Sequence, residues 1–138
     1  MESSGETSIQ IFLVTEHAAL RQSVGMLLAE EGMVIGPWAD DAASALRALP
    51  AGADAVIVGL SGGGEGGLAL LREVTSRPDS PPCIVLSVND DDASIRRALE
   101  AGARGYVTNR EAPEVLARVV REVVAGRLCA PRLKVVQE

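Results

Sequence analysis

The chain has 138 residues, a formal net charge of −6 and 47% hydrophobic residues, of which few are aromatic. This length suits one domain with one core, which must be built from Val, Leu, Ile and Ala, as in a parallel sheet between helices. The acidic balance argues against nucleic-acid binding by this segment, and no apolar run approaches the roughly 18 residues of a membrane span. Since "MESSGETS" has no apolar signal core, the sequence predicts a cytoplasmic protein, and residues 1–8 are predicted to be disordered.

Apolar patterns of strands and helices alternate along the chain. The predicted strands are 9–14, 33–38, 54–60, 83–88 and 105–109, with Pro37 stopping the second. The predicted helices are 19–32, 40–49, 67–77, 89–103 and 112–126. Five strands that alternate with five helices imply right-handed crossovers and a parallel sheet covered on both faces. The sequence therefore predicts a three-layer α/β fold.

Neither the cysteines nor the acidic run predicts a metal site. Cys83 and Cys129 lie far apart, without CxxC or Cys/His spacing, and Cys83 is expected to be a small core residue. "NDDD" at 89–92 is interpreted as a helix cap rather than a metal cluster. We expect no cofactor.

The glycine-rich stretch "GGGEGG" formally satisfies the dinucleotide pattern GxGxxG through Gly62, Gly64 and Gly67. It follows the third strand rather than the first, however, and the next strand ends in Ser87 and Val88 without an acidic residue to hold a ribose. A Walker loop fails as well, because no Lys follows the glycines. A flexible connection is the preferred interpretation over a nucleotide site.

Residues 9–126 resemble the receiver domain of bacterial response regulators, especially the branch with a LuxR-type helix-turn-helix output. "GARGYVTNREAPEVLARVVREVVAG" is similar to the last strand and helix of that branch, and "GRLCAP" to the start of its linker. The family's phosphoacceptor loop has the pattern D-L-x-M-P-G-x-D-G-L. "GLSGGGEGGL" lies on it without a gap, with Gly59 in the place of the aspartate. The resemblance implies a doubly wound five-stranded parallel sheet of the flavodoxin-like order 2-1-3-4-5, with helices on both faces.

The same resemblance locates a degenerate phosphorylation pocket. Its residues are Thr15, Glu16, Gly59, Ser87 and Asn109. Thr15 and Glu16 stand where the family has an acidic pair for Mg²⁺, so one carboxylate of three remains, which is a poor site for this ion. Ser87 retains the family's hydroxyl, whereas Asn109 replaces its lysine. An acyl phosphate cannot form on glycine, so the sequence predicts neither catalysis nor a bound metal.

Tyr106 matches the aromatic residue whose inward or outward rotamer reports the switch state of the family. With Arg96, Arg97, Val119 and Val123 it forms the predicted switch and interaction surface, because the last helix carries a broad aliphatic stripe. Structural alternatives stay open at this stage. Glu16 can be the polar start of a helix, Ser87 a strand-end hydroxyl, and Tyr106 ordinary packing.

The leading hypothesis is a phosphorylation-independent pseudo-receiver, not an enzyme, that acts as a protein-protein interaction and dimerisation module. Its expected partners are a second copy of the chain and either another protein or a fused output domain that controls transcription. It is not expected to bind a membrane. Residues 127–138 are expected to be a tail or a linker to an output domain absent from these residues. The alternative is a small-ligand sensor that binds a metabolite at the carboxyl edge of the sheet.

Overall fold

A computed structural model describes residues 8–15, 18–39, 53–60, 65–78, 80–108, 111 and 113–131. The strands are β1 (Gln10–Val14), β2 (Val34–Ala39), β3 (Ala55–Leu60), β4 (Cys83–Ser87) and β5 (Gly105–Thr108). The helices are α1 (Ala18–Glu30), α3 (Glu65–Thr75), α4 (Asp92–Glu100) and α5 (Pro113–Val124). The helix predicted over 40–49 lies outside the described residues, as do residues 1–7.

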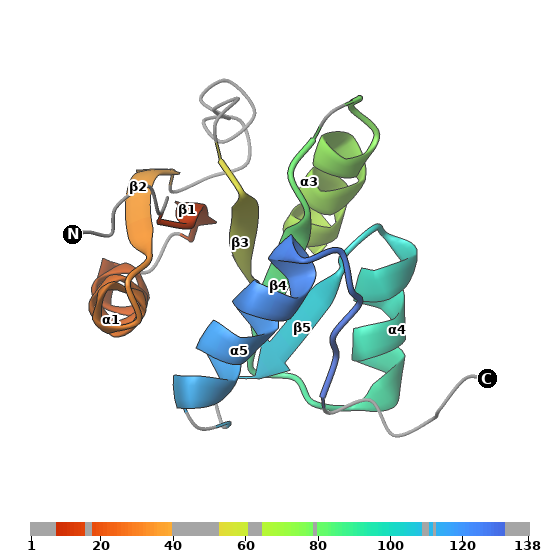
Figure 1. The fold of residues 1–138 in the computed structure, drawn as a ribbon. Helices are drawn as coiled ribbons and strands as arrows, with labels where there is room; N and C mark the ends of the chain where they lie inside the picture. Colours follow the sequence, from red (N-terminus) through yellow and green to blue (C-terminus); the bar gives the residue numbers. More distant parts are fainter. Residues whose placement is uncertain are drawn as a thin grey trace.

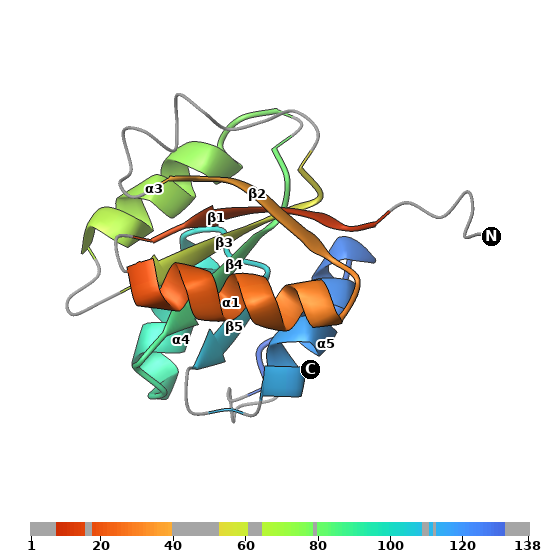
Figure 2. The same ribbon diagram turned by 90° about the vertical axis from the view of Figure 1, so that its left-hand side faces the viewer.

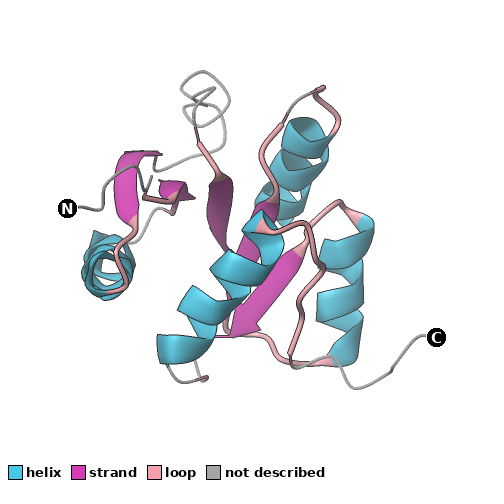
Figure 3. Ribbon diagram, viewed as in Figure 1, coloured by secondary structure: helices cyan, strands magenta, loops and turns pink. Residues whose placement is uncertain are grey.

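The five strands form one parallel sheet in the order β2-β1-β3-β4-β5. Helices α1 and α5 cover one face, and α3 and α4 cover the other (Figures 1 and 2). This arrangement confirms the predicted doubly wound fold and its strand order. Figure 3 shows the same alternation of strand and helix along the chain.

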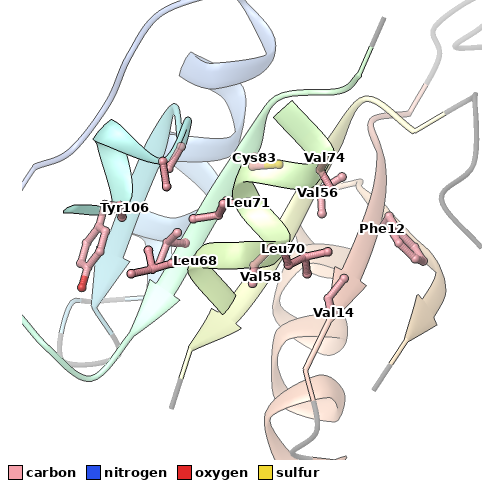
Figure 4. Close-up of a cluster of buried hydrophobic side chains, with 14 of the residues drawn as sticks. Phe12, Val14, Val56, Val58, Leu68, Leu70, Leu71, Val74, Cys83 and Tyr106 are labelled. Carbon is pink, nitrogen blue, oxygen red and sulfur yellow. The ribbon is translucent and has the colours of Figure 1, made fainter. Parts of the chain in front are cut away.

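The side chains of each strand alternate between two cores, as the period of two requires. Ile11 and Leu13 of β1 lie in the core under α1 and α5, whereas Phe12 and Val14 lie in the core under α3 and α4. Figure 4 shows the second core, in which Leu68, Leu70 and Leu71 of α3 pack over β3 and β4. Both cores are almost entirely aliphatic, as the composition predicts.

Strand β2 continues through Pro37 to Ala39, so the prediction that Pro37 ends this strand was wrong. The pairing advances by two residues on β1, from Ile11 to Leu13, but by three on β2, from Ile35 to Trp38. The extra residue is a β-bulge. Since β2 is an edge strand, a proline without an N–H can be accommodated there.

Helix α5 packs closely against β5. A Cβ atom placed on Gly105 would lie 2.9 Å from Cγ1 of Val119 and 3.0 Å from Cγ2 of Val123. Both valines are fully buried in the core. Assigning Val119 and Val123 to an exposed interaction surface was therefore a misreading of the aliphatic stripe, most of which the sheet covers. Within that stripe Val115 is half-buried and Val124 is exposed.

Candidate functional site

The site lies at the carboxyl ends of the strands, where their pairing brings the predicted residues together. Val14 pairs with Val58, so Thr15 and Gly59 are neighbours at the ends of β1 and β3. Leu60 pairs with Ser87, and Ser87 pairs with Thr108, the last residue of β5. Glu16, Asn109 and the Gly62–Gly64 part of the loop lie outside the described residues, so their predicted roles stay predictions.

Thr15 and Leu20 occupy the space next to Gly59. A Cβ atom at position 59 would lie 3.1 Å from the Thr15 hydroxyl oxygen, 3.2 Å from the Thr15 Cβ and 3.3 Å from Cδ2 of Leu20. Thr15 is buried, with 2% of its surface exposed. The position therefore has no carboxylate, and a side chain there would meet Thr15 and Leu20 at distances tighter than ordinary van der Waals contact.

The first turn of α1 closes this side of the site. The Arg21 guanidinium donates to the backbone carbonyl of Thr15 at 3.5 Å, which joins α1 to the end of β1. Leu20 lies one residue before Arg21 and packs against the core under α1. An arginine and an aliphatic residue thus lie against Thr15, and the described part of the site offers no set of metal ligands.

Ser87 is buried and hydrogen-bonded within the loop between β4 and α4. Its hydroxyl oxygen accepts from the backbone N–H of Asn89 at 3.1 Å. The hydroxyl of Tyr106 donates to the backbone carbonyl of Asn89 at 2.8 Å. Asn89 therefore receives one bond from β5 and gives one to the end of β4.

Tyr106 points inward. Its side chain lies in the core under α3 and α4, at the end nearest α4 (Figure 4), and the residue is 1% exposed. Burial raises the pKa of the Tyr106 hydroxyl, and a hydrogen bond with the Ser87 side chain opposes part of that rise. Ordinary packing explains the position of the Tyr106 ring but not of its hydroxyl, which joins β5 to the β4–α4 loop by the bond to Asn89.

Two contacts at this edge were not predicted from the sequence. The first is the acceptor role of the Asn89 carbonyl, which no side-chain pattern indicates. The second is Glu111, whose carboxylate accepts from the backbone N–H of Thr108 at 2.9 Å, while its own N–H donates to the Thr108 carbonyl at 3.1 Å. Glu111 thereby bonds to the last residue of β5 through both its side chain and its backbone.

The acidic run after β4 forms a helix cap, as predicted. Asp91 is the N-cap of α4, and its carboxylate accepts from the backbone N–H of Ser94 at 3.0 Å and from the Ser94 hydroxyl at 2.9 Å. These bonds hold the pKa of the Asp91 carboxyl below its usual value. Among the residues that the structure describes, no group of three or more His, Cys, Asp or Glu side chains is placed to hold a metal ion.

Arg96 and Arg97 are exposed on α4. Val119 and Val123 are buried, so the predicted surface keeps Tyr106 and the two arginines. Of these three residues, Tyr106 is itself buried. No helix within the described residues is long and apolar enough to cross a membrane.

Residues 11–121 match the family model of the response regulator receiver domain. The chain belongs to this family. It is 31% identical over 121 residues to the DNA-binding transcriptional activator DevR/DosR of Mycobacterium tuberculosis, which covers 86% of this chain and 56% of that protein. It is 32% identical over 120 residues to the transcriptional regulatory protein UhpA of Salmonella typhimurium, covering 86% of this chain and 60% of that one.

Among solved structures, a LuxR-family two-component response regulator from Aurantimonas sp. superposes with a TM-score of 0.81 at 27% identity. That match covers 92% of this receiver and 93% of the other chain. The receiver described here thus has the family's fold, and it spans less than two thirds of the curated relatives it matches.

Proposed function

We propose that this receiver domain transmits a signal in a two-component-type pathway without phosphorylation of an aspartate. The observation that carries the proposal is the pair Gly59 and Thr15. Glycine stands at the place that the motif gives to the phosphoacceptor, and a Cβ atom there would lie 3.1 Å from the Thr15 hydroxyl oxygen. Phosphorylation of an aspartate needs a carboxylate oxygen as the nucleophile, and the side chain of glycine has no oxygen.

The proposed mode of action is protein-protein interaction. Family membership supports a role in signal transduction from the cytoplasm, and the exposed Arg96 and Arg97 on α4 supply cations for contact with an acidic surface. Self-association to a homodimer belongs to the same proposal. The signal would then be the binding of a partner rather than a covalent modification.

A transcriptional output is the second part of the proposal. DevR/DosR is described as a DNA-binding transcriptional activator, and this chain matches 56% of it. The net charge of −6 disfavours contact with phosphates by the receiver itself. Contact with DNA would therefore be made by a separate domain that this receiver regulates.

Among the described residues, the contacts around Gly59 disfavour a metabolite pocket beside the ends of β1 and β3. A ligand pocket needs a concave space with a few convergent polar groups. Beside Gly59 the space holds the Thr15 side chain and Cδ2 of Leu20. The small-ligand sensor therefore stays the less supported candidate.

Thermal melting with Mg²⁺ and beryllofluoride, a phosphoryl mimic, tests the proposal. A ligand present at 100 times its dissociation constant would stabilise the fold by about 2.7 kcal/mol. We expect no shift of the melting temperature, because this site does not bind Mg²⁺ or beryllofluoride. The comparison variant is Thr15→Asp with Gly59→Asp and Asn109→Lys, which should regain Mg²⁺ binding. A saturable shift of the wild-type protein would contradict the proposal, and a shift with a metabolite alone would favour the sensor.

A further inference from the structure

Residues 127–131 run beside β5, on the edge of the sheet between α4 and α5 (Figure 1). Gly126 ends α5 with a φ of 95°, in the left-handed region that glycine adopts without strain. The chain then turns back, and Cys129 forms a parallel bridge with Gly105. The N–H of Cys129 donates to the Arg104 carbonyl at 2.9 Å, and the N–H of Tyr106 donates to the Cys129 carbonyl at 3.2 Å. This edge segment, residues 127–131, thus extends the sheet beyond the predicted end of the domain at residue 126.

The edge segment is held less firmly than the strand it covers. Strand β5 pairs with β4 over four residue pairs, from Gly105 to Thr108, whereas the segment makes a single isolated bridge. Cys129 and Ala130 are half-buried, but Leu128 is 50% exposed. An element with few buried contacts opens at a lower free energy than the core strands, so the segment can detach while the sheet stays folded.

Tyr106 belongs to both the switch site and the edge segment. Its hydroxyl donates to Asn89 in the β4–α4 loop, and its backbone N–H donates to Cys129 in the segment. Ala130 packs against the same core cluster that contains the Tyr106 ring. Since β5 is the last strand of the sheet and the edge segment bonds to it, the backbone of Tyr106 holds the segment while its ring lies in the core that Ala130 covers. An inward Tyr106 and a docked segment therefore favour each other.

We propose that residues 127–131 are a releasable edge strand whose docking depends on the inward position of Tyr106. A change in the β4–α4 loop that frees Tyr106 would then release this segment. The inference goes beyond the proposed function and does not depend on the nature of the signal. The coupling is reciprocal, because two states that favour each other do so equally in both directions.

The two cysteines provide the measurement. Burial raises the pKa of the Cys83 thiol to about 12, and Cys83 is fully buried, so it does not react with a disulfide reagent at neutral pH while the sheet is folded. Cys129 is half-buried in the docked edge segment and becomes fully exposed, and so reacts faster, when the segment detaches. The rate of Cys129 modification therefore reports docking, and the rate of Cys83 modification reports global unfolding.

Tyr106→Phe removes only the hydroxyl that donates to Asn89. We expect Cys129 in this variant to react roughly fivefold faster, the factor that one ordinary hydrogen bond is worth, with Cys83 unchanged. Asp54→Ala is the matched control. It removes a hydrogen bond from the Gln10 N–H at 2.8 Å, beside β1 and away from β5, and should leave Cys129 at the wild-type rate.

An unchanged Cys129 rate in Tyr106→Phe would overturn the coupling. A parallel rise in the modification rates of Cys83 and Cys129 would overturn the proposal of a detachable segment. It would mean that only global unfolding exposes Cys129. Amide hydrogen exchange at Cys129 gives a second measurement. In the docked state its N–H is protected by the hydrogen bond to the Arg104 backbone carbonyl. We expect this N–H to exchange faster in Tyr106→Phe than in Asp54→Ala.

Discussion

At the scale of single residues, the side chains around Gly59 decide the chemistry of this receiver. We infer the loss of an aspartate from the motif, because "GLSGGGEGGL" lies on the phosphoacceptor pattern without a gap. The approach of Thr15 and Leu20 is not visible there, since it depends on how α1 packs against the ends of β1 and β3. The sequence could thus predict a missing nucleophile, but it could not predict the closeness of Thr15 and Leu20 to position 59.

Gly59→Ala tests this packing. The new methyl group would lie within 3.1–3.3 Å of Thr15 and Leu20, so we expect a loss of about 1–3 kcal/mol in the free energy of unfolding, as overpacked cores show. Denaturant unfolding measures it. The control is Gly25→Ala in α1, whose methyl group would lie 3.9 Å from Cγ1 of Ile35. We expect this variant to gain up to about 1 kcal/mol in the free energy of unfolding. Equal stability of the two variants would mean that Gly59 is not crowded.

At the scale of elements, the β4–α4 loop connects the site to the edge of the sheet. The sequence indicated the cap of α4, because an acidic run before an amphipathic pattern has one common structural role. It could not indicate the bond from Tyr106 to Asn89, which joins residues 17 positions apart. The continuation of β2 through Pro37 and the docking of residues 127–131 were missed for a related reason. Both depend on edge positions in the sheet, which only its strand order defines.

The cap of α4 predicts a dependence of stability on pH. Because hydrogen bonds from Ser94 lower the folded-state pKa of Asp91 below 3.8, the stabilisation is fully present above that value. It is lost as the pH falls through the folded-state pKa. We expect Asp91→Ala to melt at a lower temperature than wild type at neutral pH, and the difference to shrink in acid. Melting curves at several pH values check this, and a difference that stays constant into strong acid would contradict it.

At the scale of the whole molecule, the proposed output is an interaction surface. Family and strand order could be predicted because strands and helices alternate regularly and because the last strand and helix match the family's motif. The composition of the surface could not be predicted, because the sequence does not say whether the aliphatic stripe of α5 packs in the core or contacts a partner. Gly105 resolves this, because Val119 and Val123 occupy the place where its side chain would begin: a Cβ atom there would lie 2.9 Å and 3.0 Å from them.

Self-association is therefore expected to depend on α4 and not on the valines of α5. We predict that sedimentation at high protein concentration detects a dimer, and that Arg96→Glu with Arg97→Glu weakens it and reduces its dependence on salt. The matched control, Arg72→Glu with Arg77→Glu, makes the same change of charge at exposed positions of α3 and the turn after it. Equal weakening by both pairs would mean that net charge, rather than this surface, governs association.

The central claim is that this receiver cannot take up a phosphoryl group on a carboxylate at its phosphoacceptor position. Intact-mass measurement after incubation with acetyl phosphate and Mg²⁺ tests it most directly. We predict an unchanged mass, because Gly59 has no oxygen to attack phosphorus and Thr15 occupies the adjoining space. A single phosphoryl adduct that hydroxylamine removes, as it removes acyl phosphates, would contradict the account.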